Sequence, residues 1–339
     1  MKSSYFDKYT VFPKPSSIER GQVNLRPISL GNLQYQLPIL SSPMDSVTGI
    51  EMINAMNDLG CGAVMHRYLS EEEFYKLNVP KNTIIAIGSI NNHKDRIVRL
   101  IDNGYTYLMV DTAHGAHIKS LKTYEFLAVR YPEVYIISGS ICTKEAAILC
   151  FAHGAHAFRV GVSPGQHCAT FENLGIGRNL IDSVKEIKSW STYIGINIPI
   201  IADGGLRGSA DLHKILVAGA SYGMFGTLFG ATLESASKLY VKIDKNSYKE
   251  FTNEEETKLT LLGANLYKKI RGMASLEALI EGNGKDKNNA MVEGISSYIK
   301  VTGSFKDLVN SMKSNLEQFC YYTGSDSVEN LIKLDLNIY

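Results

Sequence analysis

Residues 107–113 read YLMVDTA, an apolar run that ends in an aspartate and a threonine. A continuous apolar run of this length is typical of a strand buried on both faces of a parallel sheet. Further runs of the same kind are spaced along the chain, each flanked by Gly, Ser, Asp or Pro. These runs are residues 37–44, 61–67, 83–89, 134–140, 157–163, 198–204 and 222–228. The sequence therefore predicts eight strands.

Stretches with helical periodicity separate these runs, among them residues 49–59, 94–103, 143–153 and 208–218. Alternating strands and helices predict a parallel sheet, and eight such units favour closure into an α/β TIM (β/α)8 barrel. The chain lacks a GxGxxG turn after its first strand, which disfavours a doubly wound sheet.

The organisation beyond the barrel is predicted to be simple. We expect residues 1–339 to form one catalytic domain, with a polar active-site flap over about 236–304 and a closing helix at about 305–321. Its place after the eighth strand would bring the flap to the mouth of the barrel.

Composition excludes several classes of function. Of 339 residues, 45% are apolar and 20% charged, as in a globular protein with a large core. Lysine plus arginine (35) balances aspartate plus glutamate (34), so a nucleic acid or an anionic membrane is disfavoured as partner. Five cysteines without CxxC spacing disfavour a disulfide framework and a zinc site. With no apolar segment of membrane-spanning length, we expect a cytoplasmic protein.

Polar residues gather where the predicted strands end, in residues 41–45, 111–115, 161–168 and 203–205. In a TIM barrel the carboxyl ends of the strands carry the active site. The alternative for any one segment is a tight turn, since Gly, Ser and Asp also favour turns.

Cys168 lies in one of these segments, GVSPGQHCAT at 161–170. Exposed backbone amides in a glycine-rich loop would lower the pKa of its thiol and make it a candidate nucleophile. The other four cysteines lie within or beside apolar segments and are assigned to packing. Four histidines, His66, His114, His117 and His167, fall on separate loops without metal-ligand spacing, so we expect no histidine metal site.

Two glycine-containing turns could cradle a phosphate. They are Asp203-Gly204-Gly205 after the seventh strand and Gly226-Thr227 after the eighth. Glycine lets backbone amides approach phosphate oxygens, and barrels often bind phosphate at this position. Asp203 could accept hydrogen bonds from ribose hydroxyls or could instead cap a turn.

Together these segments resemble the inosine monophosphate dehydrogenase and guanosine monophosphate reductase family over nearly the whole chain. The most specific matches are SSPMDSVT at 41–48, VDTAHG at 110–115, GVSPGQHCAT, IADGG at 201–205, IRGMASLEAL at 270–279 and VEGI at 292–295. The resemblance implies a purine nucleoside monophosphate as substrate, NAD or NADP as cofactor, and a homotetramer.

The resemblance also implies roles for single residues. Cys168 would attack C2 of the purine, with Thr170 close to the reacting carbon. Asp203 would bind the ribose diol, and Asp111 would face the dinucleotide. The rest of the nucleotide pocket would comprise Gly205, Gly226 and Thr227 at the phosphate, Ser42 and Met44 along the pocket wall, and Met273 and Glu293 at the base. Backbone carbonyls of Ser163, Gly165 and Cys168 could hold potassium, as in dehydrogenase members.

The chain departs from the family pattern in the flap. The arginine and tyrosine with which dehydrogenases activate water have no clear counterpart, and Lys287 is the nearest candidate. Only residues 70–82 separate the second and third strands, so the CBS regulatory module of many dehydrogenases is expected to be absent.

Three functions remain open at this point. The first is an IMP dehydrogenase that converts IMP, NAD and water to XMP, which the segments DTAHG, MDSVT and ADGGLRGS favour. The second is a GMP reductase that uses NADPH and releases ammonia. The third is a nucleotide-binding homologue with weak turnover.

Overall fold

A computed structural model describes residues 5–162, 170–244, 247–250, 265–273, 275 and 296–338. Within these ranges the eight predicted strands are present and all neighbouring strands pair in parallel. The strands are β2 (Ile39–Ser41), β3 (Val64–Met65), β4 (Ile84–Ile87), β5 (Tyr107–Val110), β6 (Tyr135–Ile141), β7 (Ala157–Val160), β8 (Ile200–Asp203) and β9 (Tyr222–Phe225).

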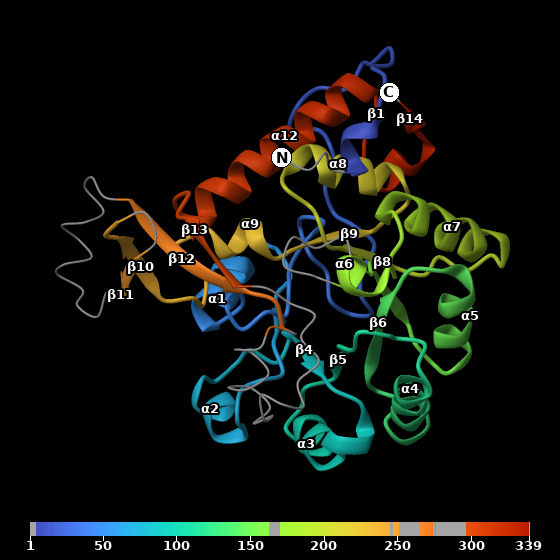
Figure 1. Cartoon of the computed structure of the whole chain (residues 1–339). Helices are drawn as coiled ribbons and strands as arrows, with labels where there is room; N and C mark the ends of the chain where they lie inside the picture. Colours follow the sequence, from blue (N-terminus) through green and yellow to red (C-terminus); the bar gives the residue numbers. More distant parts are fainter. Residues whose placement is uncertain are drawn as a thin grey trace.

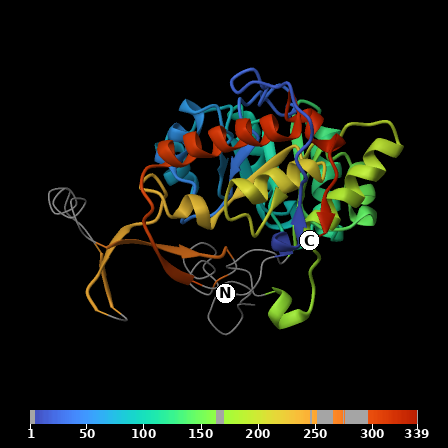
Figure 2. The same cartoon turned by 90° about the horizontal axis from the view of Figure 1, so that it is seen from above.

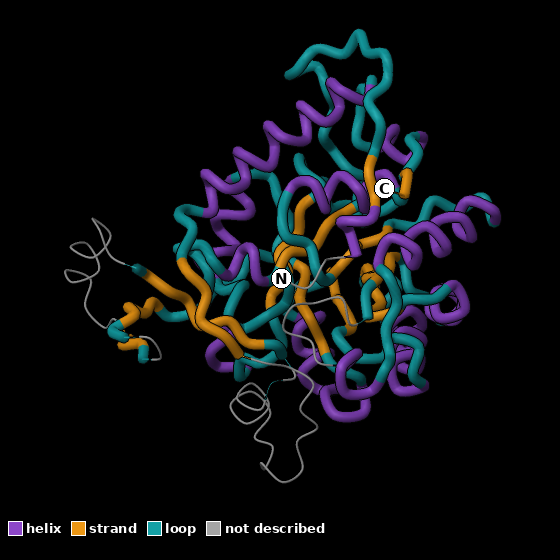
Figure 3. The backbone as a smooth tube through the Cα atoms, turned by 45° about the horizontal axis from the view of Figure 1, so that its top comes forward, coloured by secondary structure: helices purple, strands orange, loops and turns teal. Residues whose placement is uncertain are grey.

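The strands follow the spatial order β2-β9-β8-β7-β6-β5-β4-β3, so the first and last strands in this order are β2 and β3. A parallel bridge between Leu40 and Gly62 joins them, with Gly62 N donating to Ile39 O at 3.0 Å. This bridge closes the sheet on itself, and the predicted TIM barrel is confirmed. Figure 3 shows the strands at the centre of the molecule with helices outside them.

Helices alternate with the strands, and most of them cover the outside of the barrel (Figure 1). The helices are α1 (Ile50–Asp58), α2 (Glu71–Lys76), α3 (Ile90–Asp102), α4 (Ile118–Arg130), α5 (Lys144–Ala152), α6 (Thr170–Leu174), α7 (Leu180–Tyr193), α8 (Ser209–Val217), α9 (Thr227–Gly230) and α12 (Phe305–Thr323). The short helix α6 lies away from this outer layer (Figure 2). Local sequence sets several of their ends. Ser70 and Glu73 form a capping box at α2, and Gly324, with φ of 68°, ends α12 in the left-handed conformation.

Two apolar clusters pack on opposite faces of the sheet. Residues such as Ile85, Leu108 and Phe158 belong to the larger cluster, which includes helix residues. The alternate residues of the same strands form a second, smaller cluster inside the barrel, including Met109, Ala157 and Ile201. This alternation follows from the period of two along a strand.

The chain between α9 and α12 differs from expectation. It contains a four-stranded antiparallel sheet in the order β11-β10-β12-β13. Its strands are β10 (Leu239–Lys242), β11 (Tyr248–Glu250), β12 (Leu266–Arg271) and β13 (Ser296–Lys300). The sequence analysis placed a polar flap over about 236–304 and did not predict these strands. Figure 2 shows this sheet extending to one side of the barrel.

The amino and carboxyl segments meet at one end of the fold. Strand β1 (Tyr9–Thr10), which follows helix η1 (Tyr5–Lys8), pairs antiparallel with β14 (Asn337–Ile338), which follows η3 (Glu329–Lys333). The predicted closing helix is confirmed as α12 and lies along the outer side of the barrel (Figure 2). None of the helices in the described ranges combines the length and apolar character needed to cross a membrane.

Candidate active site at the barrel mouth

The mouth of the barrel is lined by residues that lie just beyond the apolar interior, at or after the carboxyl ends of the strands. The buried interior cluster includes Leu40, Met109, Ala157, Ile201 and Met224. Because side chains alternate along a strand, the residue two places later points the same way, toward the barrel axis. These later positions are Ser42, Asp111, Arg159, Asp203 and Gly226. Because alternate residues of each strand face the barrel axis, residues from separate strands, among them four predicted site residues, form one layer above the apolar interior.

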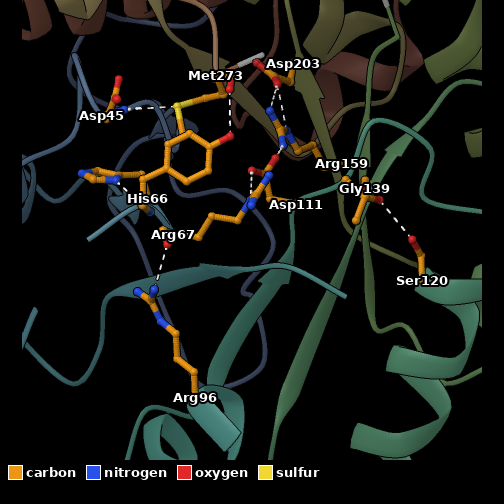
Figure 4. A network of polar contacts seen from close by, with 12 residues as sticks. Asp45, His66, Arg67, Arg96, Asp111, Ser120, Gly139, Arg159, Asp203 and Met273 are labelled. Atoms are coloured by element: carbon orange, nitrogen blue, oxygen red, sulfur yellow. Dashed lines mark hydrogen bonds and ion pairs between the residues drawn. The ribbon is translucent and has the colours of Figure 1, made fainter. Parts of the chain in front are cut away.

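Arg159, on β7, holds the centre of this layer (Figure 4). Its Nη1 donates to Oδ1 of Asp111 at 2.6 Å. Its Nε and Nη2 both lie close to Oδ2 of Asp203, at 2.8 and 2.6 Å. The side chains of all three residues are 11 to 14% exposed. Two of the predicted ligand-binding carboxylates are thus tied to one guanidinium.

A second arginine extends the network toward β3. Arg67 Nε donates to Oδ2 of Asp111 at 3.2 Å, and its guanidinium lies over the ring of Tyr68. Arg96 Nη1 donates in turn to the backbone carbonyl of Arg67 at 2.9 Å. Charges therefore alternate across the mouth in the order Arg67, Asp111, Arg159, Asp203.

The electrostatics of this network keep Arg159 and Asp111 ionised. Burial alone would favour the neutral forms, but the Asp203 and Asp111 carboxylates outweigh it and raise the pKa of Arg159. For Asp111, burial is likewise outweighed by Arg159 and Arg67, which lower its pKa. Burial instead lowers the pKa of His66, at the end of β3, to about 4, so this imidazole is neutral near pH 7.

Two glycines allow close contacts around Arg159, one beside its side chain and one between the ends of β7 and β8. A Cβ at Gly139 would lie 2.8 Å from Cβ of Arg159. At Gly161, where φ is 149°, a Cβ would lie 1.9 Å from the carbonyl oxygen of Asp203. The backbone leading to the Cys168 segment therefore runs directly against the end of β8, and only glycine fits there.

The predicted wall and phosphate residues come together from β2, β8 and β9. Ser42 N donates to Phe225 O at 3.0 Å, and a Cβ on Gly226 would meet Met44 Sδ at 2.9 Å. Thr227 begins α9, with Gly226 as its N-cap residue. Gly205, directly after Asp203, has φ of 78°, a conformation that suits a tight turn in glycine.

Met273 lies over the mouth because the loops after β2 and β3 hold it (Figure 4). Asp45 N donates to its Sδ at 3.3 Å, and Tyr68 Oη donates to its backbone carbonyl at 2.8 Å. Two residues earlier, Arg271 forms an ion pair of 2.6 Å with Asp45. The end of β12 is thereby fastened to the barrel.

Several predicted residues cannot be placed in this geometry. Cys168, Lys287, Glu293, Ser163 and Gly165 lie outside the described residues. Thr170 is the first residue of α6. Within the described ranges there is no group of three or more His, Cys, Asp or Glu residues that could hold a metal ion.

The other cysteines match their assignment to packing with one difference. Cys61, Cys150 and Cys320 are buried free thiols, and burial raises the pKa of each. Cys142 is only half-buried, at the end of β6.

The two arginines of the network were missed by the sequence analysis. A signal for Arg159 was present, because a charged residue inside the apolar run AFRVGVS requires a buried partner. Its position two residues after Ala157 also places it on the inward face. Arg67 carries a weaker signal, since it follows its strand and could equally well be solvated.

Comparison with known proteins places these features in context. A family model described as the IMP dehydrogenase / GMP reductase domain matches residues 3–255 and 250–337. The chain is 26% identical to an inosine-5'-monophosphate dehydrogenase of Borreliella burgdorferi, over 96% of this chain and 91% of that protein. It is 27% identical to the enzyme of that name from Cryptosporidium parvum (98% and 90%). It is 28% identical to a GMP reductase of Streptococcus agalactiae (91% and 86%).

Proposed function

Because this chain belongs to the IMP dehydrogenase / GMP reductase family, we propose that it is an oxidoreductase acting at C2 of a purine nucleoside 5'-monophosphate. The observation that carries the proposal is the layer at the barrel mouth, where Asp111 and Asp203 are tied to Arg159 beside Ser42 and Gly226. Charged acceptors for two sugars and glycine turns for a phosphate lie together there.

We assign nucleotide binding to the side of the mouth formed by β2, β8 and β9. Both contacts from Arg159 fall on Oδ2 of Asp203, so we assign Oδ1 to the ribose hydroxyls. Backbone amides at Gly205, Gly226 and Thr227 would donate hydrogen bonds to the phosphate, which can approach closely because two of these three residues are glycine. Ser42 and Met44 would line the pocket wall, with Met273 and Glu293 at the base.

The residues of the opposite side fit a dinucleotide. Asp111 is ionised, lies at the mouth, and could accept hydrogen bonds from a ribose of NAD or NADP. When bound, the nicotinamide supplies the acceptor or donor of a hydride.

The chemistry at the purine would be carried by residues of the chain. In the dehydrogenase direction the Cys168 thiolate adds to C2 of IMP, and C2 loses a hydride with its two electrons. Water then displaces the sulfur, giving XMP, the regenerated thiolate and one proton. We assign activation of that water to Thr170 and Lys287, because neutral water is a poor nucleophile.

The reductase is the second candidate, because a GMP reductase matches the chain over a similar share of its length. In that direction the Cys168 thiol would displace ammonia from C2 of GMP, and transfer of a hydride to C2, which NADPH would supply, would release IMP and the thiolate. A homologue that binds nucleotide with weak turnover is the third candidate. We favour the dehydrogenase because the segments DTAHG and MDSVT resemble that branch.

Absorbance of the reduced nicotinamide tests the proposal directly. We expect formation of NADH when IMP and NAD are added to the purified protein, and none with Cys168→Ser, which should still bind IMP. Consumption of NADPH with GMP would establish the reductase instead. Binding of either nucleotide without a change in absorbance would leave the third candidate, and a wild-type protein that binds neither nucleotide would overturn the proposal.

Other expectations remain proposals of the same kind. The chain would act as one catalytic domain assembled into a homotetramer in the cytoplasm, and potassium could bind to carbonyls of Ser163, Gly165 and Cys168. Light scattering and activity with and without potassium would test the assembly and the ion.

A further inference from the structure

The position of Arg159 between two carboxylates carries an inference beyond the assignment of single binding residues. Asp203 and Asp111 are on β8 and directly after β5, so two strands separate them in the barrel. Arg159 comes from β7 and contacts both, at 2.6 to 2.8 Å. The two carboxylates that we assign to different ligands therefore share one cation.

The guanidinium has little freedom to serve one partner without affecting the other. Its side chain is 11% exposed. The space beside it exists because residue 139 is glycine, since a Cβ at this position would lie 2.8 Å from Cβ of Arg159. Its planar fork matches carboxylate oxygens in fixed directions. A rotation that improves the contact with Asp203 must change the contact with Asp111.

Asp111 has a second cation, and the two differ in how tightly they are held. Arg67 contacts Oδ2 of Asp111 at 3.2 Å and is 22% exposed, whereas Arg159 contacts Oδ1 at 2.6 Å and is 11% exposed. A dinucleotide ribose can therefore compete with Arg67 for Asp111 while Arg159 stays in place. Arg159 is the fixed member of the network.

We propose that Arg159 is a positioning residue that couples the nucleotide and dinucleotide subsites, so that filling one subsite orders the other. A ribose bound to Asp203 would fix the Asp203–Arg159 pair, and Arg159 would then hold Asp111 in the orientation that the dinucleotide needs. The converse follows by reciprocity of binding free energies. This inference rests on the proposed function.

The test measures IMP affinity by calorimetry with and without adenosine diphosphate ribose, which has the sugars and diphosphate of the dinucleotide but accepts no hydride. We expect the wild-type protein to bind IMP at least about fivefold more tightly with this probe present, the lower end of usual coupling. Arg159→Lys keeps the charge but not the fork. It should weaken both ligands about tenfold and reduce the coupling factor to about one.

Arg67→Lys is the matched control, because within the described residues Arg67 pairs with Asp111 and not with Asp203. It should change the affinity for the probe, because Arg67 and the probe share Asp111, while leaving the affinity for IMP alone within about twofold, as expected for sites without a shared contact. A general loss of structure would affect both variants, and thermal unfolding identifies it. If Arg159→Lys does not fold, Asp111→Asn replaces it and should change IMP affinity at least about threefold without any probe.

The inference is overturned if Arg159→Lys weakens only one ligand, if its coupling persists, or if Asp111→Asn leaves IMP binding unchanged. These outcomes can be distinguished from failure of the proposed function. If the proposed function were wrong, the wild-type protein itself would not bind IMP and would show no change in nicotinamide absorbance.

Discussion

Arg159 in the barrel mouth and Lys268 in the antiparallel sheet are both buried cations, but Arg159 contacts carboxylates and Lys268 contacts neutral backbone carbonyls. Arg159 faces two carboxylates. Lys268, on β12, is 5% exposed, and its Nζ donates to the backbone carbonyls of Leu233, Ser235 and Ser237 at 3.0, 3.1 and 2.6 Å. Ionic partners raise the pKa of Arg159, whereas burial among neutral carbonyls lowers the pKa of Lys268 to about 8.

This difference shows that the two buried cations have different structural roles. A cation that contacts two carboxylates holds both side chains in place, and its removal leaves uncompensated charge. A charge opposite carbonyls fastens one backbone segment to another. Lys268 joins β12 to residues 233–237, at the point where the chain leaves the barrel for the sheet.

Removing the guanidinium is expected to have the largest effect on stability. Arg159→Met leaves Asp111 and Asp203 buried without their shared cation, which should lower the free energy of unfolding by about 3 to 5 kcal/mol. Chemical denaturation measures the loss. Adding Asp111→Asn and Asp203→Asn to the same variant should restore part of it, and no recovery in this triple variant would contradict the ionic explanation.

Removing the ammonium from the sheet is expected to cost less. Lys268→Met keeps the apolar stem and removes the ammonium, which leaves three carbonyls without this donor, so about 2 kcal/mol should be lost. The same denaturation experiment measures it. A variant as stable as the parent would show that water replaces the ammonium without penalty.

The pH dependence of Lys268 follows from its lowered pKa. Its value is about 8 in the folded chain against 10.5 for the unperturbed group, mainly because of burial. Between these values the unfolded chain binds more protons, so the contribution of Lys268 to stability rises with pH. The stability difference between the parent and Lys268→Met should therefore grow by about 2 to 3 kcal/mol from pH 8 to 10.5. A difference that is constant or shrinks over this range would contradict the lowered pKa.

The smallest expected effect concerns the tyrosines of the sheet. Tyr298 stacks on Tyr248 with ring centroids 3.9 Å apart and meets Tyr240 edge to face at 5.1 Å. Tyr298→Leu should lower the free energy of unfolding by about 1 kcal/mol through loss of these ring contacts. Tyr193, 89% exposed at the end of α7, is the matched control. Equal losses in Tyr193→Leu and Tyr298→Leu would show that the stacking adds nothing.

The barrel was predictable because each strand carries its own signal. Continuous apolar runs such as that of β5 indicate strands buried on both faces, and their order required no knowledge of distant contacts. The predicted runs extended past the strands, since their terminal Gly, Ser and Asp residues form turns. Asp203 and Asp111 were predicted as site residues for the same reason, because they lie near the ends of such runs.

The antiparallel sheet was missed because the sequence of its longest described strand, β12, does not alternate cleanly between apolar and polar residues. In β12 the buried positions are Leu266, Lys268 and Ile270, so a lysine stands where alternation requires an apolar residue. The carbonyls that satisfy this lysine lie more than thirty residues earlier and leave no local signal. The pairing of Arg159 with two carboxylates was missed likewise, because only the closed barrel brings β5, β7 and β8 together.

The chain leaves the barrel and returns to it at one point. Thr232 and Gly303 form a parallel bridge, with Leu233 N donating to Gly303 O at 3.1 Å and Thr302 N to Ala231 O at 2.9 Å. Everything between them, including β10 to β13 and Met273, is an insertion whose ends are already joined. Such an insertion can change in length and sequence during evolution without disturbing the strands that carry Asp111, Arg159 and Asp203. The covering of the site is thus free to diverge between relatives, while the charged layer beneath it belongs to the barrel itself.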